Sequence, residues 1–184
     1  RLSATERRQA ALAVQMVFQD PMASLNPRLR VVDIIGEAPV AHGIVPHSEM
    51  DAYVCGMMER VGLDPASRHL YPHQFSGGQR ARIGIARALA VKPKVLVCDE
   101  STAALDVSIQ AQILNLFMKL RAEMGLTYVF VSHDLSVVEH ISDRIAVMYL
   151  GRVVELADAE SLFENPKHPY TRSLLNEVPK LEPV

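Results

Sequence analysis

Two apolar runs of strand length, joined by one amphipathic segment, constrain the fold of this chain more than any other feature. The runs are residues 95–98 and 127–131, and residues 108–123 between them place apolar side chains along one side of a helix. A strand, a helix and a second strand in this order favour a parallel sheet. The run 95–98 has no polar alternation, which predicts a strand covered on both faces. We therefore expect an α/β fold around a parallel sheet.

The remaining elements are predicted from apolar spacing and from turn residues. Ser48 is a plausible N-cap for the second helix after the first strand, and Gly62 lies just past the end of that helix. Gly151 is expected to form the turn of an antiparallel hairpin. Further strands are predicted at 13–18, 143–149 and 152–157, and helices at 1–10, 31–41, 48–61, 77–91, 135–141, 158–164 and 168–177, with a short helix beginning at 64–65.

Composition excludes several classes of protein. The 184 residues are enough for one domain with a real core. A net charge of −2, no Trp and few aromatic residues argue against binding to nucleic acid. No apolar run reaches the length of a membrane span, and no signal peptide is expected at the start. Cys55 and Cys98 lack metal-ligand spacing, so we expect reduced core thiols in a cytoplasmic protein.

Two acidic residues, Asp99 and Glu100, directly follow the first apolar run. The carboxyl end of a strand is where an open α/β sheet presents ligand-binding residues. One carboxylate at such a place can serve a Mg²⁺ ion while the next polarises a water molecule. The alternative, for these two residues alone, is a solvated strand end.

The run of residues 75–79, Phe-Ser-Gly-Gly-Gln, stands immediately before a basic, Ala-rich helix. Its glycines allow backbone N–H groups to approach an anion, and the helix adds the positive end of its dipole. A flexible turn is the alternative for this run alone. Of the helix arginines, we expect Arg82 and Arg87 to lie on a solvated face.

These motifs, taken together and in this order, resemble those of ABC-type ATPases. The run 75–79 resembles the signature motif of that family, and Asp99-Glu100 resembles its Walker B element with the catalytic Glu. Residues 17–21, Val-Phe-Gln-Asp-Pro, resemble the Q-loop. His133 resembles the switch histidine, and Asp106, in the segment 104–106, resembles the D-loop residue.

The resemblance implies a role for each matching residue in binding and hydrolysing ATP with Mg²⁺. Gln19 would contact the metal and the attacking water, and Asp99 would hold the metal, through a water molecule. Glu100 would act as general base, with His133 steadying the γ-phosphate. The residues expected to bind the γ-phosphate of ATP on a second subunit are Ser76, Gly77, Gly78 and Gln79. Asp106 would cross the same interface, so that ATP joins two copies head to tail.

The implied fold is that of an ABC-type P-loop NTPase, a parallel sheet core with an inserted helical subdomain. Residues 1–28 and 91–184 would belong to the RecA-like core, and residues 29–90 to the helical signature subdomain. The sequence contains no G-x-x-x-x-G-K-[ST] motif and starts with Arg1, so we expect a chain truncated before the Q-loop. Such a chain would hydrolyse no ATP alone and would expose apolar sheet surface. Ser101 stands where the family usually has Pro, which lowers the rigidity of that loop.

The tail at residues 163–172 resembles the C-terminal element of dipeptide, oligopeptide, nickel and glutathione importer ATPases. Residues 105–108 and 110–114 indicate the same group. Membership would imply two transmembrane permease subunits, a second ATPase subunit, a solute-binding protein, and a location on the cytoplasmic face of the cell membrane. Two alternatives remain: an ABC-type ATPase of DNA repair or translation, and a non-catalytic interaction module that docks an intact ATPase or permease.

Overall fold

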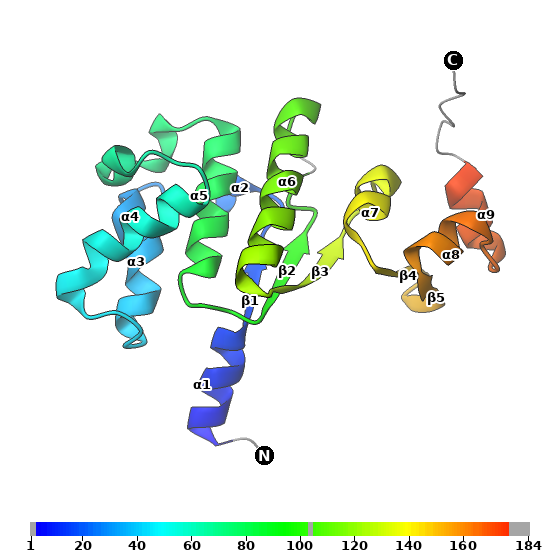
Figure 1. Cartoon of the computed structure of the whole chain (residues 1–184), viewed down its shortest axis with the longest axis horizontal. Coiled ribbons are helices and arrows are strands. Elements are labelled where there is room, and N and C mark those ends of the chain that lie inside the picture. The colour runs from blue at the N-terminus through cyan, green and yellow to red at the C-terminus, as the bar shows by residue number, and fades with distance from the viewer. Residues whose placement is uncertain (1–2, 103–104, 177–184) are drawn as a thin grey trace. The chain divides into compact units, whose positions relative to one another are not determined.

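A computed structural model of the chain describes residues 3–102 and 105–176. It divides into two compact units, Arg1–Val131 and Ser132–Val184. Ala104 and residue 177, part of the predicted 104–106 segment and of the last predicted helix, lie outside the described residues. Figure 1 labels the elements along the chain.

Three parallel strands form the sheet of the first unit, in the order β1-β2-β3. They are β1 Val14–Val17, β2 Val95–Asp99 and β3 Thr127–Val131. Helix α6, Val107–Met124, connects β2 to β3. The predicted parallel crossover is therefore confirmed, and β1 joins the same sheet although 81 residues separate Val14 from its partner Val95. Before β1, helix α1 (Ala4–Ala13) begins with a capping box between Ser3 and Glu6.

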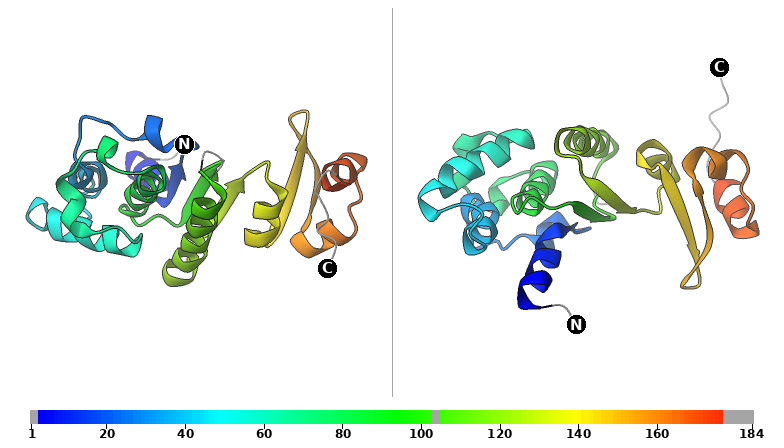
Figure 2. Two further views of the ribbon diagram at one scale, coloured as in Figure 1. Left: turned by 90° about the horizontal axis from the view of Figure 1, so that it is seen from above. Right: turned by 60° about the horizontal axis from the view of Figure 1, so that its bottom comes forward.

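The core of the unit lies on one face of this sheet. Helices α5 and α6 both lie on that side (Figure 2), where Leu96 and Cys98 are fully buried. The aromatic ring of Phe117, on α6, makes edge contacts with Tyr128 and Phe130 of β3. Burial raises the pKa of the Cys98 thiol to about 12, so this cysteine stays protonated, as expected of a core thiol.

The opposite face of the sheet is open in the described part of the chain. Its exposed fractions are 48% for Val14, 36% for Met16, 49% for Val129 and 47% for Val131. The prediction that residues 95–98 are covered on both faces is thus wrong, because the strand is buried only at alternate residues. The expected exposure of apolar sheet surface is found here.

A series of helices lies between β1 and β2 in the sequence, and three of them pack against one another. The bounds are α2 Pro21–Ser24, α3 Val31–Ala41, η1 His47–Glu49, α4 Met50–Arg60, η2 Pro65–His69, η3 Pro72–Gln74 and α5 Gly77–Leu89. Helices α3, α4 and α5 contact one another through buried aliphatic side chains. Whether residues 29–90 form a separate subdomain remains a prediction.

Two details of this segment differ from the sequence-based expectation. The N-cap of α4 is Glu49 rather than Ser48, because residues 47–49 form a 3₁₀ turn before the helix. The short helix α2 was not predicted. Gly62, at φ 74°, follows the end of α4 as predicted.

Up to residue 176, where the described residues end, the second unit contains a two-stranded antiparallel sheet and three helices. Its elements are α7 Leu135–Ile141, β4 Arg144–Tyr149, β5 Arg152–Asp158, α8 Ala159–Glu164 and α9 Pro169–Asn176. Gly151, at φ 76°, forms the predicted turn of the β4–β5 hairpin. Glu155, on β5, accepts hydrogen bonds from the backbone N–H groups of Lys167 (2.8 Å) and His168 (3.0 Å), which ties the loop before α9 to the hairpin.

Candidate functional site

Two predicted site residues meet at the carboxyl end of the parallel sheet. The side-chain amide of Gln19 donates a hydrogen bond to the carboxylate of Glu100 at 2.6 Å, across 81 residues of sequence. Gln19 follows β1 and Glu100 follows β2, so the pairing of these two strands brings the side chains together. The Gln19 side chain is exposed and Glu100 is half-buried, which leaves the pair accessible from solvent.

Glu100 has an unusual backbone conformation. Its φ is 44°, in the left-handed region that costs a non-glycine residue about 1–2 kcal/mol. Its N–H donates to the carbonyl of Val131, at the end of β3, at 2.9 Å. This bond holds the residue where the chain leaves the sheet, and strain of this kind is concentrated at functional sites. Ser101, which follows, is buried, and its hydroxyl has no hydrogen-bond partner among the described residues.

The acidic pair suits a metal ion held mainly by water and phosphate. Asp99 is the last residue of β2 and is half-buried, beside Glu100 in sequence. Within residues 3–102 and 105–176, no three His, Cys, Asp or Glu side chains lie close enough to form a metal cluster. Mg²⁺ at phosphate sites is usually held by one or two carboxylates together with phosphate and water, a donor set to which Asp99 could contribute. That Asp99 and Gln19 hold this ion remains a prediction.

The signature run forms the N-terminus of α5. Ser76 is the N-cap, and its hydroxyl accepts from the N–H of Gln79 at 3.3 Å, while the Gln79 side chain accepts from the N–H of Ser76 at 2.9 Å. The polar side chains of this run are thus engaged in a capping box, which sequence reasoning did not foresee. The N–H groups of Gly77 and Gly78 are those that a helix leaves without an intrahelical partner.

Close packing explains the glycine at residue 78 but not the one at residue 77. A Cβ on Gly78 would lie 2.7 Å from Cγ2 of Ile109, on α6, so close helix packing explains this buried position. Among the described residues, a Cβ on Gly77 would meet Leu105 alone, at 4.0 Å, and Gly77 is exposed. Packing therefore does not explain Gly77, which stays a candidate for close approach to a ligand.

The other two predicted site residues occupy helix starts or strand ends. Asp106 is exposed and caps α6, with its carboxylate accepting from the N–H of Ile109 at 2.9 Å. His133 is exposed and belongs to the second unit, just after β3. Its predicted proximity to the acids remains a prediction.

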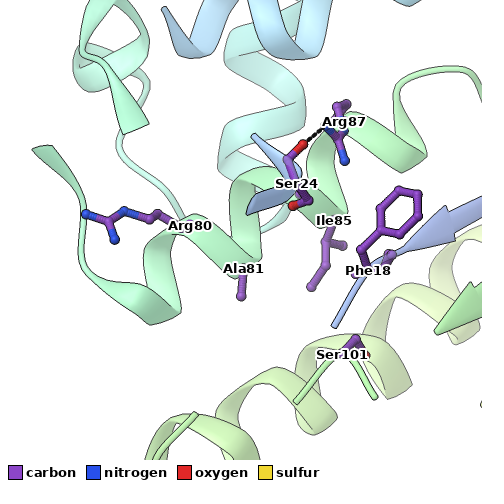
Figure 3. Close-up of a pocket in the computed structure, with 9 residues that line it drawn as sticks. Phe18, Ser24, Arg80, Ala81, Ile85, Arg87 and Ser101 are labelled. Atoms are coloured by element: carbon purple, nitrogen blue, oxygen red, sulfur yellow. Dashed lines mark hydrogen bonds between the residues drawn. The ribbon is translucent and has the colours of Figure 1, made fainter. Parts of the chain in front are cut away.

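The arginines of α5 correct an expectation. Arg82 donates to the carbonyl of Val61 at 2.6 Å, and Arg87 donates to the carbonyl of Ser24 at 2.6 Å, so neither simply points into solvent. Figure 3 shows the Arg87 contact. The sequence did contain a signal that Arg87 is not simply solvated, because apolar residues flank it on both sides in the helix.

Comparison with known proteins shows the family to which this chain belongs. A family model described as "ABC transporter" matches residues 1–103, more than half of the 184 residues. The chain belongs to the ABC transporter family. A second model, "Oligopeptide/dipeptide transporter, C-terminal region", matches residues 154–184.

Curated relatives of this ABC transporter chain are named for glutathione import or oligopeptide transport. The chain is 55% identical to the glutathione import ATP-binding protein GsiA of Escherichia coli, over 92% of the chain and 27% of the relative. It is 56% identical to the oligopeptide transport ATP-binding protein OppF of Bacillus subtilis, over 92% of the chain and 56% of the relative. The chain thus spans little more than a quarter of the one and about half of the other.

A solved ABC transporter structure has the same fold. CbiO1 of Clostridium perfringens, described as part of the ABC transporter complex cbiONQ, superimposes with a TM-score of 0.78 at 27% identity. The match covers 97% of this chain and 69% of the other. The α/β fold expected from the family resemblance is thereby confirmed. Among the described residues, no helix combines the length and the apolar character needed to cross a membrane.

Proposed function

We propose that this chain is part of an ATP-binding and ATP-hydrolysing subunit that powers import through a membrane ABC transporter. The observation that supports this most directly is the hydrogen bond between Gln19 and Glu100 at the carboxyl end of the sheet. It joins Gln19, expected to contact the metal and the attacking water, to Glu100, expected to activate that water. Phosphoryl transfer depends on such positioning and on charge stabilisation, so few groups are needed.

Each side chain has a defined part in the proposed reaction. Glu100 accepts a proton from the water that attacks the γ-phosphate, and Gln19 holds the Glu100 carboxylate in place through its 2.6 Å bond. Asp99 and Gln19 would hold Mg²⁺, which when bound neutralises phosphate charge. His133 would contact the γ-phosphate.

A second copy would complete the site. The start of α5 (Ser76, Gly77, Gly78 and Gln79) would face the γ-phosphate of ATP bound to the other subunit, and Asp106 would lie at the same interface. The capping box supports this proposal, because it fixes the Ser76 and Gln79 side chains and presents the first-turn N–H groups of α5.

The C-terminal residues 154–184 support a proposal about the cargo and the other partners. Residues 154–184 match the oligopeptide/dipeptide transporter C-terminal region, and the similar proteins GsiA and OppF are named for glutathione import and oligopeptide transport. We propose peptides or glutathione as the cargo, two permeases and a second ATPase subunit as direct partners, and a solute-binding protein as an indirect one. The subunit would lie on the cytoplasmic face of the cell membrane.

Phosphate release by the complete gene product tests this proposal. Glu100→Gln should lower the Mg²⁺-dependent rate by roughly 10²–10⁴-fold, as loss of a general base does, while ATP binding persists. Glu123→Gln is the matched control: the same chemical change on α6, in a surface ion pair with Lys119 (3.7 Å), should leave the rate unchanged. Equal rates for wild type and Glu100→Gln would contradict the proposal.

The 184-residue chain by itself provides a second test of the proposal. Its sequence has no G-x-x-x-x-G-K-[ST] loop to hold the β- and γ-phosphates, so we expect weak ATP binding and no hydrolysis above the Glu100→Gln background. Magnesium-dependent turnover by these residues alone would show that the proposed need for that loop is wrong.

A further inference from the structure

Arg87 lies in the most buried part of α5. Its neighbours Ile85, Ala86, Ala88 and Leu89 are almost fully buried, whereas Arg87 itself is half-buried. Burial lowers the pKa of its guanidinium, which shows that desolvation of this cation is incompletely offset. A cation kept in such a place, at a cost in stability, requires an explanation.

The guanidinium reaches across 63 residues of sequence to the segment that follows Gln19. Its Nη1 donates to the carbonyl oxygen of Ser24 at 2.6 Å (Figure 3). Ser24 is the last residue of α2, and its own N–H bonds the carbonyl of Asp20 at 3.0 Å, which closes that turn. Arg87 is thus attached to a four-residue helix that begins two residues after Gln19.

A small hollow lies beside the contact between Arg87 and Ser24. This hollow, between α2, α5 and the end of β1, is lined by Phe18, Ser24, Ile85, Arg87 and Ser101, among others (Figure 3). Phe18 is 48% exposed, and the buried Ser101 hydroxyl on the other wall has no partner among the described residues. Leu25, directly after α2, is buried, so apolar packing and the charge-assisted Arg87–Ser24 hydrogen bond both constrain where α2 lies.

We propose that Arg87 is a positioning residue that holds α2, and through it Gln19, within reach of Glu100. Contacts then run without a break from α5 through Arg87, Ser24 and Asp20 to Gln19 and Glu100. The same helix begins at Ser76, so a displacement of α5 at one end is transmitted to the Gln19 amide at the other. The role in catalysis rests on the proposed function, whereas the role in holding α2 does not.

Arg87→Met tests the proposal, with Arg82→Met as its matched control. Arg82 lies on the same helix and also donates to a backbone carbonyl at 2.6 Å, but to Val61, away from Gln19. In the 184-residue chain, amide hydrogen exchange at residues 18–25 should quicken about tenfold in Arg87→Met and stay unchanged in Arg82→Met. In the complete gene product, Arg87→Met should lower kcat roughly ten- to a hundredfold with KM for ATP unchanged.

The outcomes separate this inference from the proposed function. If the complete wild-type protein has no ATPase activity, the proposed function is contradicted. Hydrogen exchange then still tests whether Arg87 holds α2. An active wild type with unchanged kcat and unchanged exchange in Arg87→Met overturns the inference. If Arg87→Met does not fold, Arg87→Gln replaces it, because its shorter neutral amide cannot reach Ser24 and should give the same loss. Equal effects of the Arg82 and Arg87 changes would also overturn it, since they would indicate a general weakening of α5.

Discussion

Glu100 combines a strained backbone with a short side-chain hydrogen bond. Its φ of 44° turns the chain away from β2, and the bond from Gln19 fixes the carboxylate in the resulting direction. Both residues could be predicted from sequence, because a strand end followed by Gln or by two acids limits where these side chains can lie. The backbone strain could not, since Glu disfavours the left-handed region and only the surrounding sheet imposes it.

Glu155 offers a pH-dependent test at the same scale. The nearby Thr171 hydroxyl, although outside strict hydrogen-bond geometry, and the N–H groups of Lys167 and His168 lower the pKa of Glu155 from 4.5 to about 2. Because the pKa is lower in the folded chain, the stabilisation is full above about pH 4.5 and is lost as the pH falls toward 2. The amide chemical shifts of Lys167 and His168 should therefore be constant down to about pH 4 and change with a midpoint near 2.

The control for that titration is Glu155→Gln, which removes the ionisable group. Its amide shifts at Lys167 and His168 should show no such midpoint. A wild-type midpoint near 4.5, the ordinary value for Glu, would mean that these bonds do not form in solution.

At the scale of elements, α5 shows what periodicity can and cannot reveal. Its start was predictable from Ser76 and the glycines, and its end, at Leu89, lies two residues before the predicted one. Its contacts were not predictable, because Arg82, Arg87 and Gly78 find their partners on segments distant in sequence. The four-residue helix α2 was missed for a similar reason, since one turn is too short for an apolar period.

Two glycines of α5 should respond in opposite ways to alanine. Gly78→Ala places a Cβ 2.7 Å from the β-branched Ile109 and should lower the free energy of unfolding by about 1–3 kcal/mol. Gly84→Ala meets nothing within 4 Å and should raise it by up to about 1 kcal/mol, through helix propensity. Urea unfolding of the chain measures both changes. An unchanged or raised stability of Gly78→Ala would show that α5 and α6 do not approach as closely as described, and destabilisation by Gly84→Ala would show that the space beside Gly84 is filled.

At the scale of the whole molecule, the parallel sheet followed from the alternation of strands and helices. The apolar run 95–98 alone predicted burial on both faces, because such a run looks the same whether or not a covering element is present. The exposure of apolar sheet surface was predicted only from the family resemblance and the missing G-x-x-x-x-G-K-[ST] motif. The position of His133 relative to the acids is beyond sequence reasoning, since it depends on how units rather than neighbouring residues are arranged.

The open sheet face should cause self-association of the 184-residue chain. Val14 and Val129 lie on that face, 48% and 49% exposed. The double variant Val14→Thr/Val129→Thr keeps β-branched side chains and should weaken association about tenfold or more, because each buried methyl contributes about 0.8 kcal/mol. Sedimentation velocity over a range of concentrations measures this. Val107→Thr, at an 83% exposed residue at the start of α6, is the control and should change nothing. A chain that is monomeric at every concentration would contradict the prediction.

The pairing of β1 with β2 also governs how the protein can be made. Val14 leaves the ribosome 81 residues ahead of Val95, which at 5–20 residues per second is a wait of roughly 4–16 s. Local contacts among α3, α4 and α5 can form during that interval, whereas the pairing of β1 with β2 cannot. A nascent chain halted before β2 therefore holds formed helices and an unsatisfied apolar strand, the kind of segment that chaperones bind. The meeting of Gln19 and Glu100 therefore has to wait until β2 and Glu100 have been made.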